Sequence, residues 1–182
     1  MVRKVMLIRH GEKPSEDGVQ FGVGPRGQAD DNGLSVRGWQ RAGALVRLFS
    51  PLSGQAIRAG LAVPSALFAP ATVPSGSERP RLTLLPLAEM LSMPIRSHVA
   101  KGDEASLAEL ARTTDGVVLV CWSHQGLSAI ARDLVGGDQW VPSRWPADRF
   151  DMVWIIDFDQ GRTRFTQVPQ CLLAGDSAAA IV

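Results

Sequence analysis

The sequence is poor in cysteine, has almost no net charge and contains no long apolar run. Its 19 basic and 18 acidic residues leave a net charge of +1, so charge gives no reason to expect nucleic acid or an anionic membrane as a partner. No stretch approaches the 18 apolar residues of a membrane-spanning helix. Two cysteines do not make the disulfide framework of a small secreted domain, and the apolar run around Cys121 predicts a buried thiol. The N-terminus shows no signal-peptide pattern, and we therefore expect a cytoplasmic protein.

The 182 residues suit a single domain, 1–182, whose last residues, about 169–182, we expect to form a loosely held tail. Apolar runs predict strands over 5–8, 65–69, near residue 95, and over 116–122, while helical patterns cover 34–49, 79–91, 105–112 and 127–135. Runs over 152–158 and 162–168 flank a glycine turn and predict a hairpin. This alternation predicts an α/β three-layer sandwich with a mostly parallel sheet and a C-terminal antiparallel hairpin.

Two of the predicted helices carry details that a structure can test. Ser35 is expected to cap the helix over 34–49, with Arg37, Arg41 and Arg47 on its solvated face. Pro86 lies inside the helix over 79–91 and is expected to kink or divide it, because proline removes a backbone donor and its ring clashes with the preceding turn.

Two of the three histidines follow the best predicted strands. The first strand ends in Arg9-His10-Gly11, and the strand over 116–122 ends in Ser123-His124-Gln125. Open α/β sheets bind their ligands at the carboxyl ends of the strands, where Gly11 would let a ligand approach closely. A lone histidine is more often structural, but the paired placement beside an arginine favours a functional site.

Two imidazoles and guanidinium groups suit the chemistry of a phosphoryl group. Arginine binds phosphate oxygens with paired hydrogen bonds and stays charged, while phosphoryl transfer depends mainly on positioning and electrostatics. A neutral imidazole can attack phosphorus to give a phosphohistidine that water later cleaves. Because the arginines neutralise the phosphate, this chemistry requires no metal and no cofactor. His10, His98 and His124 also lack the spacing and the carboxylates of a metal site.

The segment Leu7-Ile8-Arg9-His10-Gly11-Glu12 resembles the signature of the histidine phosphatase superfamily, the phosphoglycerate-mutase-like proteins with the Arg-His-Gly motif. Further similar elements follow in the family's order: Gly33-Leu34-Ser35 with Gln40-Arg41-Ala42, then Arg79-Pro80-Arg81-Leu82-Thr83, then Val118-Leu119-Val120 with Ser123-His124-Gln125-Gly126. The similarity spans positions 3 to about 135, and the order of the motifs is its most specific feature.

The resemblance implies a phosphoglycerate-mutase-like fold and a metal-independent phosphomonoesterase. By position, His10 would be the phosphorylated nucleophile, Arg9 and Arg79 would bind the phosphate, and His124 would complete the pocket. Gly11 and Gln125 would also contact substrate. The substrate would be a small phosphorylated molecule or a phosphoprotein, and the loops 13–33, 70–78 and 99–104 would set its specificity.

The proton donor of the family has no clear counterpart. Gln125 follows the second histidine, at a place where some relatives carry an aspartate, and it cannot act as an acid. Asp103 and Glu104 are the only carboxylates in the segment 93–107, where other relatives carry a glutamate. Either could reach the site from a loop, although both also fit the solvated start of a helix.

Three alternatives stay open at this level. The chain could bind a phosphorylated ligand or partner without turnover, because the acid motif is missing. It could be a phosphoglycerate-type mutase, although it is short for one, or a phosphatase acting on phosphohistidine in proteins. A cysteine phosphatase is excluded because Leu127, not arginine, lies six positions after Cys121. The oligomeric state cannot be predicted.

Overall fold

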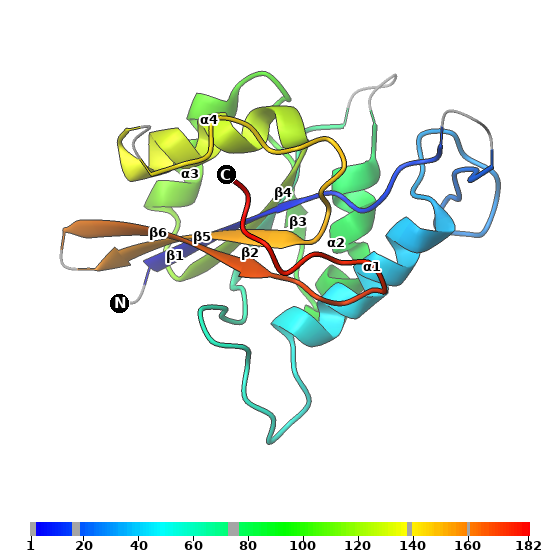
Figure 1. Cartoon of the computed structure of the whole chain (residues 1–182), viewed down its shortest axis with the longest axis horizontal. Helices are drawn as coiled ribbons and strands as arrows, with labels where there is room; N and C mark the ends of the chain where they lie inside the picture. Colours follow the sequence, from blue (N-terminus) through cyan, green and yellow to red (C-terminus); the bar gives the residue numbers. More distant parts are fainter. Residues whose placement is uncertain (1–2, 16–18, 73–76, 138–139, 160) are drawn as a thin grey trace.

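The computed structural model describes residues 3–15, 19–72, 77–137, 140–159 and 161–182, in which strands and helices alternate as predicted (Figure 1). The strands are β1 (Arg3–Arg9), β2 (Ala66–Phe68), β3 (Ile95–Arg96), β4 (Val117–Trp122), β5 (Met152–Asp159) and β6 (Arg162–Pro169). The helices are α1 (Val36–Phe49), α2 (Arg79–Leu91), α3 (Glu104–Thr113) and α4 (His124–Val135).

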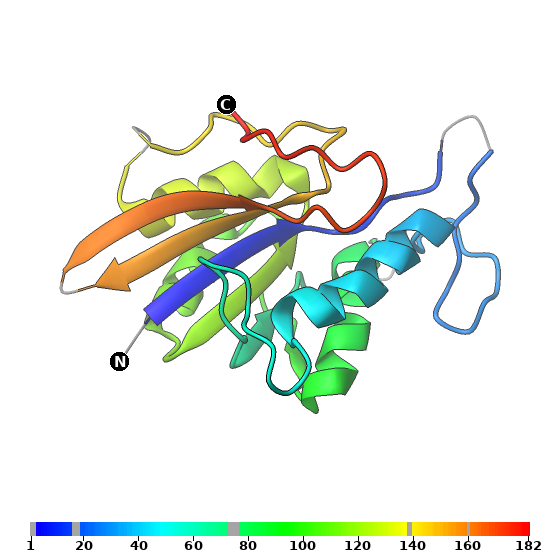
Figure 2. The same cartoon turned by 60° about the horizontal axis from the view of Figure 1, so that its bottom comes forward.

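The six strands form one mixed sheet in the order β3-β2-β4-β1-β5-β6. β1, β2, β3 and β4 are parallel, whereas β5 runs antiparallel to β1 and forms the hairpin with β6. α3 and α4 cover one face and α1 and α2 the other, which gives three layers (Figure 2). The predicted α/β sandwich is therefore confirmed.

Side chains of β1 alternate between two hydrophobic cores. Val5 and Leu7 pack with residues of α3 and α4, while Met6 and Ile8 pack with residues of α1 and α2. This alternation follows from the pleat of a strand, in which successive side chains point to opposite faces. Because both faces are covered, the central residues 5–8 of the strand are all apolar, as in parallel strands inside α/β proteins.

Helix α1 differs from the prediction on its charged face. The Ser35 hydroxyl caps the helix by accepting the Gly38 amide N–H at 3.1 Å, as expected. Arg47 is exposed and Arg37 is half-buried, but Arg41 is only 1% exposed. The expectation that Arg41 belongs to a solvated face is wrong, because its guanidinium group is enclosed by carboxylates from distant parts of the chain.

Two other helices begin or continue differently from their predicted patterns. α2 is a single helix through Pro86, so this proline does not divide it. α4 starts at His124 rather than at Leu127, because Ser123 occupies the N-cap position with extended backbone angles. His124 therefore lies in the first turn of a helix, where its position is fixed by the backbone.

The antiparallel course of β5 and β6 determines which loops reach the carboxyl end of β1. Ile8 of β1 pairs with Val153, so β5 starts at the edge of the sheet where β1 ends. Met152 pairs with Pro169, so β6 ends at the same edge. The loop that enters β5 and the segment that follows β6 therefore both lie near the end of β1, where Arg9 and His10 are found.

The segment 169–182, expected to be loosely held, is held by specific bonds. The Asp176 carboxylate accepts hydrogen bonds from Arg41 and from the Leu172 and Leu173 amides, at 2.8 to 3.1 Å. The Ile181 amide donates to the Gln167 side chain at 2.9 Å, and the Ile181 side chain is 3% exposed. The terminal segment is therefore part of the packed domain. Within the described residues, no helix has the length and apolar character needed to cross a membrane.

Candidate active site

A cavity of about 450 Å³ lies at the carboxyl ends of β1 and β4. Parallel pairing places Arg9 beside Trp122, and the His10 amide donates to the Trp122 carbonyl at 3.1 Å. Residues from six segments line the cavity: Arg9, His10, Lys13, Pro70, Ala71, Ser77, Arg79, Pro80, Ala100, Lys101, Ser123, His124, Gln125 and Ala147. The structure thus brings together His10, Arg9, Arg79, His124 and Gln125, which sequence analysis had assigned to one site.

His10 is oriented by a bond to its neighbouring backbone. Its Nδ1 lies 2.8 Å from the Gly11 carbonyl oxygen, which can only accept, so Nδ1 carries the proton. Nε2 is then the nitrogen with a lone pair. Burial lowers the pKa of His10 to about 3; the bond to Gly11 opposes this, and the charges of Arg9, Arg79 and His124 add to it. The His10 imidazole is therefore neutral at physiological pH.

Gly11 packs closely against other elements of the fold, beside His10. Its amide donates to the Thr83 hydroxyl at 2.8 Å, and it is not among the residues that line the cavity. A Cβ at this position would lie 2.9 Å from the Gly38 carbonyl oxygen of α1. The glycine is required by close packing on α1, whereas sequence analysis had attributed it to the approach of a ligand.

Arg9 is fixed by the loop that enters β5. Its Nη1 donates to the Pro146, Ala147 and Arg149 carbonyls at 3.3, 2.6 and 3.0 Å, and its guanidinium carbon lies 3.7 Å from the centre of the Phe150 ring. Nε is buried and has no partner in the described part of the chain. Burial lowers the pKa of Arg9 to about 10, although Glu12 and Asp148 oppose the shift, so the group stays charged at pH 7.

Arg79 enters the cavity from the first turn of α2. Its Nε donates to the Gly33 carbonyl at 3.0 Å and its Nη2 to the Asp31 carbonyl at 2.8 Å. Burial lowers the pKa of this group, and Asp30 opposes the shift. The loop 31–33 thus orients the Arg79 guanidinium group toward the cavity. Arg79 Nη1 takes part in neither of these two bonds.

His124 lies in the N-terminal turn of α4, which faces the same cavity. Ser123, His124 and Gln125 all line it, and a helix N-terminus favours negative charge because its first amide groups are not bonded within the helix. Burial lowers the pKa of His124, and the charges of Arg9, Lys101 and Lys13 lower it further. The Gln125 side-chain Oε1 accepts a hydrogen bond from Lys101 Nζ at 2.7 Å.

The charge of the cavity has one sign. Arg9, Lys13, Arg79 and Lys101 line it, and no aspartate or glutamate does so among the described residues. Such a lining can bind a multiply charged anion and stabilise charge on phosphoryl oxygens. Lys13 and Lys101 were not predicted as site residues, but both lie in loops that were expected to set specificity.

The two carboxylates suggested as proton donors do not line this cavity. The Asp103 carboxylate caps α3 by accepting from the Ser106 amide at 3.4 Å. The Glu104 carboxylate accepts from Trp122 Nε1 at 2.9 Å and from the Gly102 amide at 3.2 Å. Both side chains have local structural partners, as expected for a helix start. Within the described residues, no cluster of three or more His, Cys, Asp or Glu side chains could hold a metal ion.

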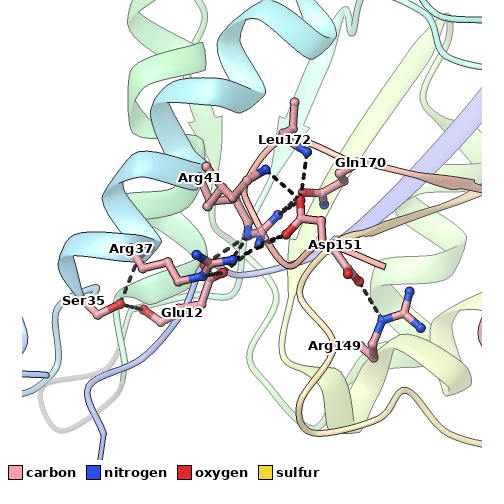
Figure 3. Close-up of polar contacts among 12 residues, drawn as sticks. Glu12, Ser35, Arg37, Arg41, Arg149, Asp151, Gln170 and Leu172 are labelled. Atoms are coloured by element: carbon pink, nitrogen blue, oxygen red, sulfur yellow. Dashed lines mark hydrogen bonds and ion pairs between the residues drawn. The ribbon is translucent and has the colours of Figure 1, made fainter. Parts of the chain in front are cut away.

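An ionic network that was not predicted from the sequence surrounds Glu12, two positions after His10 (Figure 3). Arg41 Nη2 lies 2.7 Å from the Glu12 carboxylate and 2.8 Å from that of Asp176, and Arg41 Nη1 donates to Gln170 Oε1 at 2.9 Å. Arg37 Nε also pairs with Glu12, at 3.2 Å. Burial alone would raise the pKa of Asp176, but hydrogen bonds from Arg41, Leu173 and Leu172 lower it to about 2. This network connects α1 and the C-terminal segment to the residue after Gly11.

The fold and the cavity define a class: the chain has the fold of the histidine phosphatases. One solved structure with this fold is the protein histidine phosphatase SixA complexed with tungstate, with a TM-score of 0.56, 16% identity, and coverage of 92% of this chain and 97% of that one. Another is a phosphoserine phosphatase variant from Entamoeba histolytica in complex with phosphoserine, with a TM-score of 0.53, 12% identity, and coverage of 90% and 95%.

A third similar structure is YhfR from Bacillus stearothermophilus, with a TM-score of 0.53 and 13% identity over 96% of this chain and 98% of that one. No protein-family model and no curated protein sequence matches the chain. These similarities establish the fold of the chain.

The burial of a neutral histidine predicts how stability depends on pH. The unfolded state binds a proton at His10 near pH 6.5, whereas the folded state does so only near pH 3, so the free energy of unfolding should decrease as pH falls from about 6.5 toward 3. One such proton contributes a slope of up to about 1.4 kcal/mol per pH unit. Urea unfolding at pH 7, 5.5 and 4.5 should show a shallower decrease for His10→Asn than for the wild type. Equal slopes would contradict a buried neutral imidazole.

Proposed function

We propose that the chain is a metal-independent phosphomonoester hydrolase that acts through a phosphohistidine on His10. The observation that carries the proposal is the bond between His10 Nδ1 and the Gly11 carbonyl, which leaves the Nε2 lone pair for substrate in a cavity lined by cations. Arg9 and Arg79 would bind the phosphoryl oxygens, and His124 would donate a hydrogen bond to them. Gln125 would contact the substrate beside Lys101.

The reaction would follow from this arrangement in two steps. In the first, His10 Nε2 attacks phosphorus in line, a P–N bond forms, and the P–O bond to the leaving group breaks. In the second, water attacks the phosphohistidine, the electron pair of the P–N bond returns to Nε2, and phosphate leaves. The low pKa of His10 keeps the nucleophile unprotonated, and the fixed guanidinium groups stabilise the charge of both transition states.

The substrate class is narrower than "any phosphate ester" in one respect. Four cationic side chains line the cavity, and no carboxylate does so among the described residues, which favours substrates with several negative charges or with a leaving group that departs readily. A phosphorylated small molecule or a phosphoprotein would both satisfy this requirement. The similarity to a protein histidine phosphatase makes phosphohistidine in a protein one candidate, since its P–N bond breaks without an alkoxide leaving group.

Trapping of the covalent intermediate tests this proposal. The protein is mixed with ³²P-labelled phenyl phosphate and the reaction is quenched in alkali, because phosphohistidine is stable there. The protein is then digested and its peptides are separated. We expect label on the peptide that contains His10 and none on the peptides that contain His98 or His124. Activity toward p-nitrophenyl phosphate should be unchanged by EDTA. Turnover that disappears in EDTA, or label on His124, would contradict the mechanism.

A second candidate is binding of a phosphorylated ligand without turnover, which is favoured by the lack of a carboxylate among the described lining residues. It predicts measurable binding of phenyl phosphate by calorimetry with neither hydrolysis nor labelling at high enzyme concentration. A phosphoglycerate-type mutase is a further alternative. It predicts transfer of the label from 2,3-bisphosphoglycerate to monophosphoglycerate, which a hydrolase would instead release as inorganic phosphate.

A further inference from the structure

A second cavity of about 640 Å³ adjoins the active-site cavity and shares His124, Gln125 and Ala147 with it. Its remaining lining comes from α4 and from the loop that enters β5, and includes Ser128, Arg132, Arg144 and Asp148. Two buried polar atoms, Ser128 Oγ and Arg132 Nε, have no hydrogen-bond partner within the described residues. The second cavity therefore has the volume and the polar groups to bind the part of a substrate that extends beyond His124.

Asp148 is the one carboxylate among the described residues lining either of these two cavities. It lies between Ala147 and Arg149, whose carbonyl oxygens are 2.6 and 3.0 Å from Arg9 Nη1, so its backbone is anchored at the phosphate-binding arginine. The side chain is exposed, and within the described residues it makes no hydrogen bond or ion pair. Its charge also acts on Arg9.

Three other carboxylates near the site have hydrogen-bond or ion-pair partners of their own. Glu12 is bound by Arg41 and Arg37, and Glu104 by Trp122. Asp30 acts on Arg79 electrostatically, but its carboxylate accepts from the Asn32 amide at 2.9 Å and it lines neither cavity. Among the described residues, Asp148 is therefore the carboxyl group best placed to exchange a proton with a bound substrate.

We propose that Asp148 donates a proton to the leaving group of the substrate. This group departs from the phosphoryl-binding site toward the second cavity. This inference rests on the proposed function. His10 is deep in the site, with 7% of its surface exposed, so a group leaving opposite Nε2 moves outward toward the exposed rim where Asp148 lies. As the P–O bond breaks, its electron pair passes to the leaving oxygen, which takes the proton of the Asp148 carboxyl group.

In the second step the resulting carboxylate takes a proton from water while that water attacks the phosphohistidine, so the acid is restored when phosphate leaves. The charged and titratable groups that line the cavities around Asp148 include Arg9, Arg132 and Arg144, together with His124.

A series of leaving groups distinguishes this role from a structural one. For Asp148→Asn, kcat/KM is measured with p-nitrophenyl phosphate, phenyl phosphate and glycerol 1-phosphate, in which the leaving oxygen becomes steadily more basic. We expect the loss to grow from less than about 10-fold with the first to about 10²- to 10⁴-fold with the last, because general acid catalysis contributes by that range where a proton is needed. Asp148→Glu should recover part of the lost activity with glycerol 1-phosphate.

The control is Asp103→Asn, which removes a carboxylate that lines neither cavity and should change the three rates by one common, small factor. An equal loss for all three substrates in Asp148→Asn would overturn the proposal, since it would indicate that Asp148 only positions the loop that holds Arg9. The proposed function would survive that result. Failure of the wild type to form a phosphohistidine would instead overturn the hydrolase mechanism itself.

Discussion

Replacement of His10 by asparagine is expected to lower kcat/KM for p-nitrophenyl phosphate by at least about 10⁴-fold, because the proposed covalent step would then have no nucleophile. Asparagine retains an N–H group that can donate to the Gly11 carbonyl, so the loop should keep its conformation. Arg9, Arg79 and His124 remain in place, and the variant should still bind phosphate with an affinity near that of the wild type. Steady-state kinetics and calorimetry with inorganic phosphate measure the two effects separately.

His98 supplies the matched control. It is exposed, belongs to the loop before α3, and is not among the residues that line the cavity, so His98→Asn should leave kcat/KM unchanged within about twofold. Substantial turnover by His10→Asn would mean that water attacks the substrate directly. In that case His10 would act through electrostatics alone, and no phosphohistidine should be found.

Replacement of Arg41 by methionine is expected to lower the free energy of unfolding by about 3–5 kcal/mol, because it leaves two carboxylates without their main partner in a buried environment. The Glu12 and Asp176 side chains are 11% and 3% exposed, and both depend on the same guanidinium group. Loss of this group should also loosen Glu12, and with it the Gly11 carbonyl that orients His10. Urea unfolding followed by tryptophan fluorescence measures the stability.

Arg47→Met provides the control in the same helix. Arg47 is exposed in the last turn of α1, and its replacement should change the free energy of unfolding by less than about 0.5 kcal/mol. Combining Arg41→Met with Glu12→Gln and Asp176→Asn should recover part of the lost stability, because the uncompensated charges are removed together. A simple sum of the three destabilising effects would contradict the network as described.

Local sequence patterns predicted most of what is local in this fold. Apolar runs indicated the strands, and the order of strands and helices indicated a mostly parallel sheet. His10 and His124 could be placed in one site because the carboxyl ends of neighbouring parallel strands lie at the same edge. Arg79 could be assigned through the resemblance to a family, although not through its distance along the chain. These predictions needed only periodicity and strand direction.

What the sequence could not provide are contacts between residues far apart in the chain. Helical spacing already places Arg41 beside the buried Ala42 and Leu45, but its partner Asp176 is 135 residues away and carries no local pattern. The position of Asp148 beside the cavities could not be predicted, because it depends on β5 running antiparallel to β1. Asp103 and Glu104 were considered instead because they lie where a family motif would place an acid, although each has a structural partner nearby.

The bond between Arg41 and Asp176 also bears on the order in which the protein can assemble during synthesis. His10 and Glu12 belong to the loop that follows β1, yet that loop is closed by Asp176, a carboxylate 164 positions after Glu12. Contacts of such long range form late, because the intervening chain must first be ordered. A nascent chain whose residue 176 has not yet emerged from the ribosome can form much of the sheet. Its Arg41 would then pair with Glu12 but not with Asp176. Full preorganisation of His10 is therefore among the last events of folding.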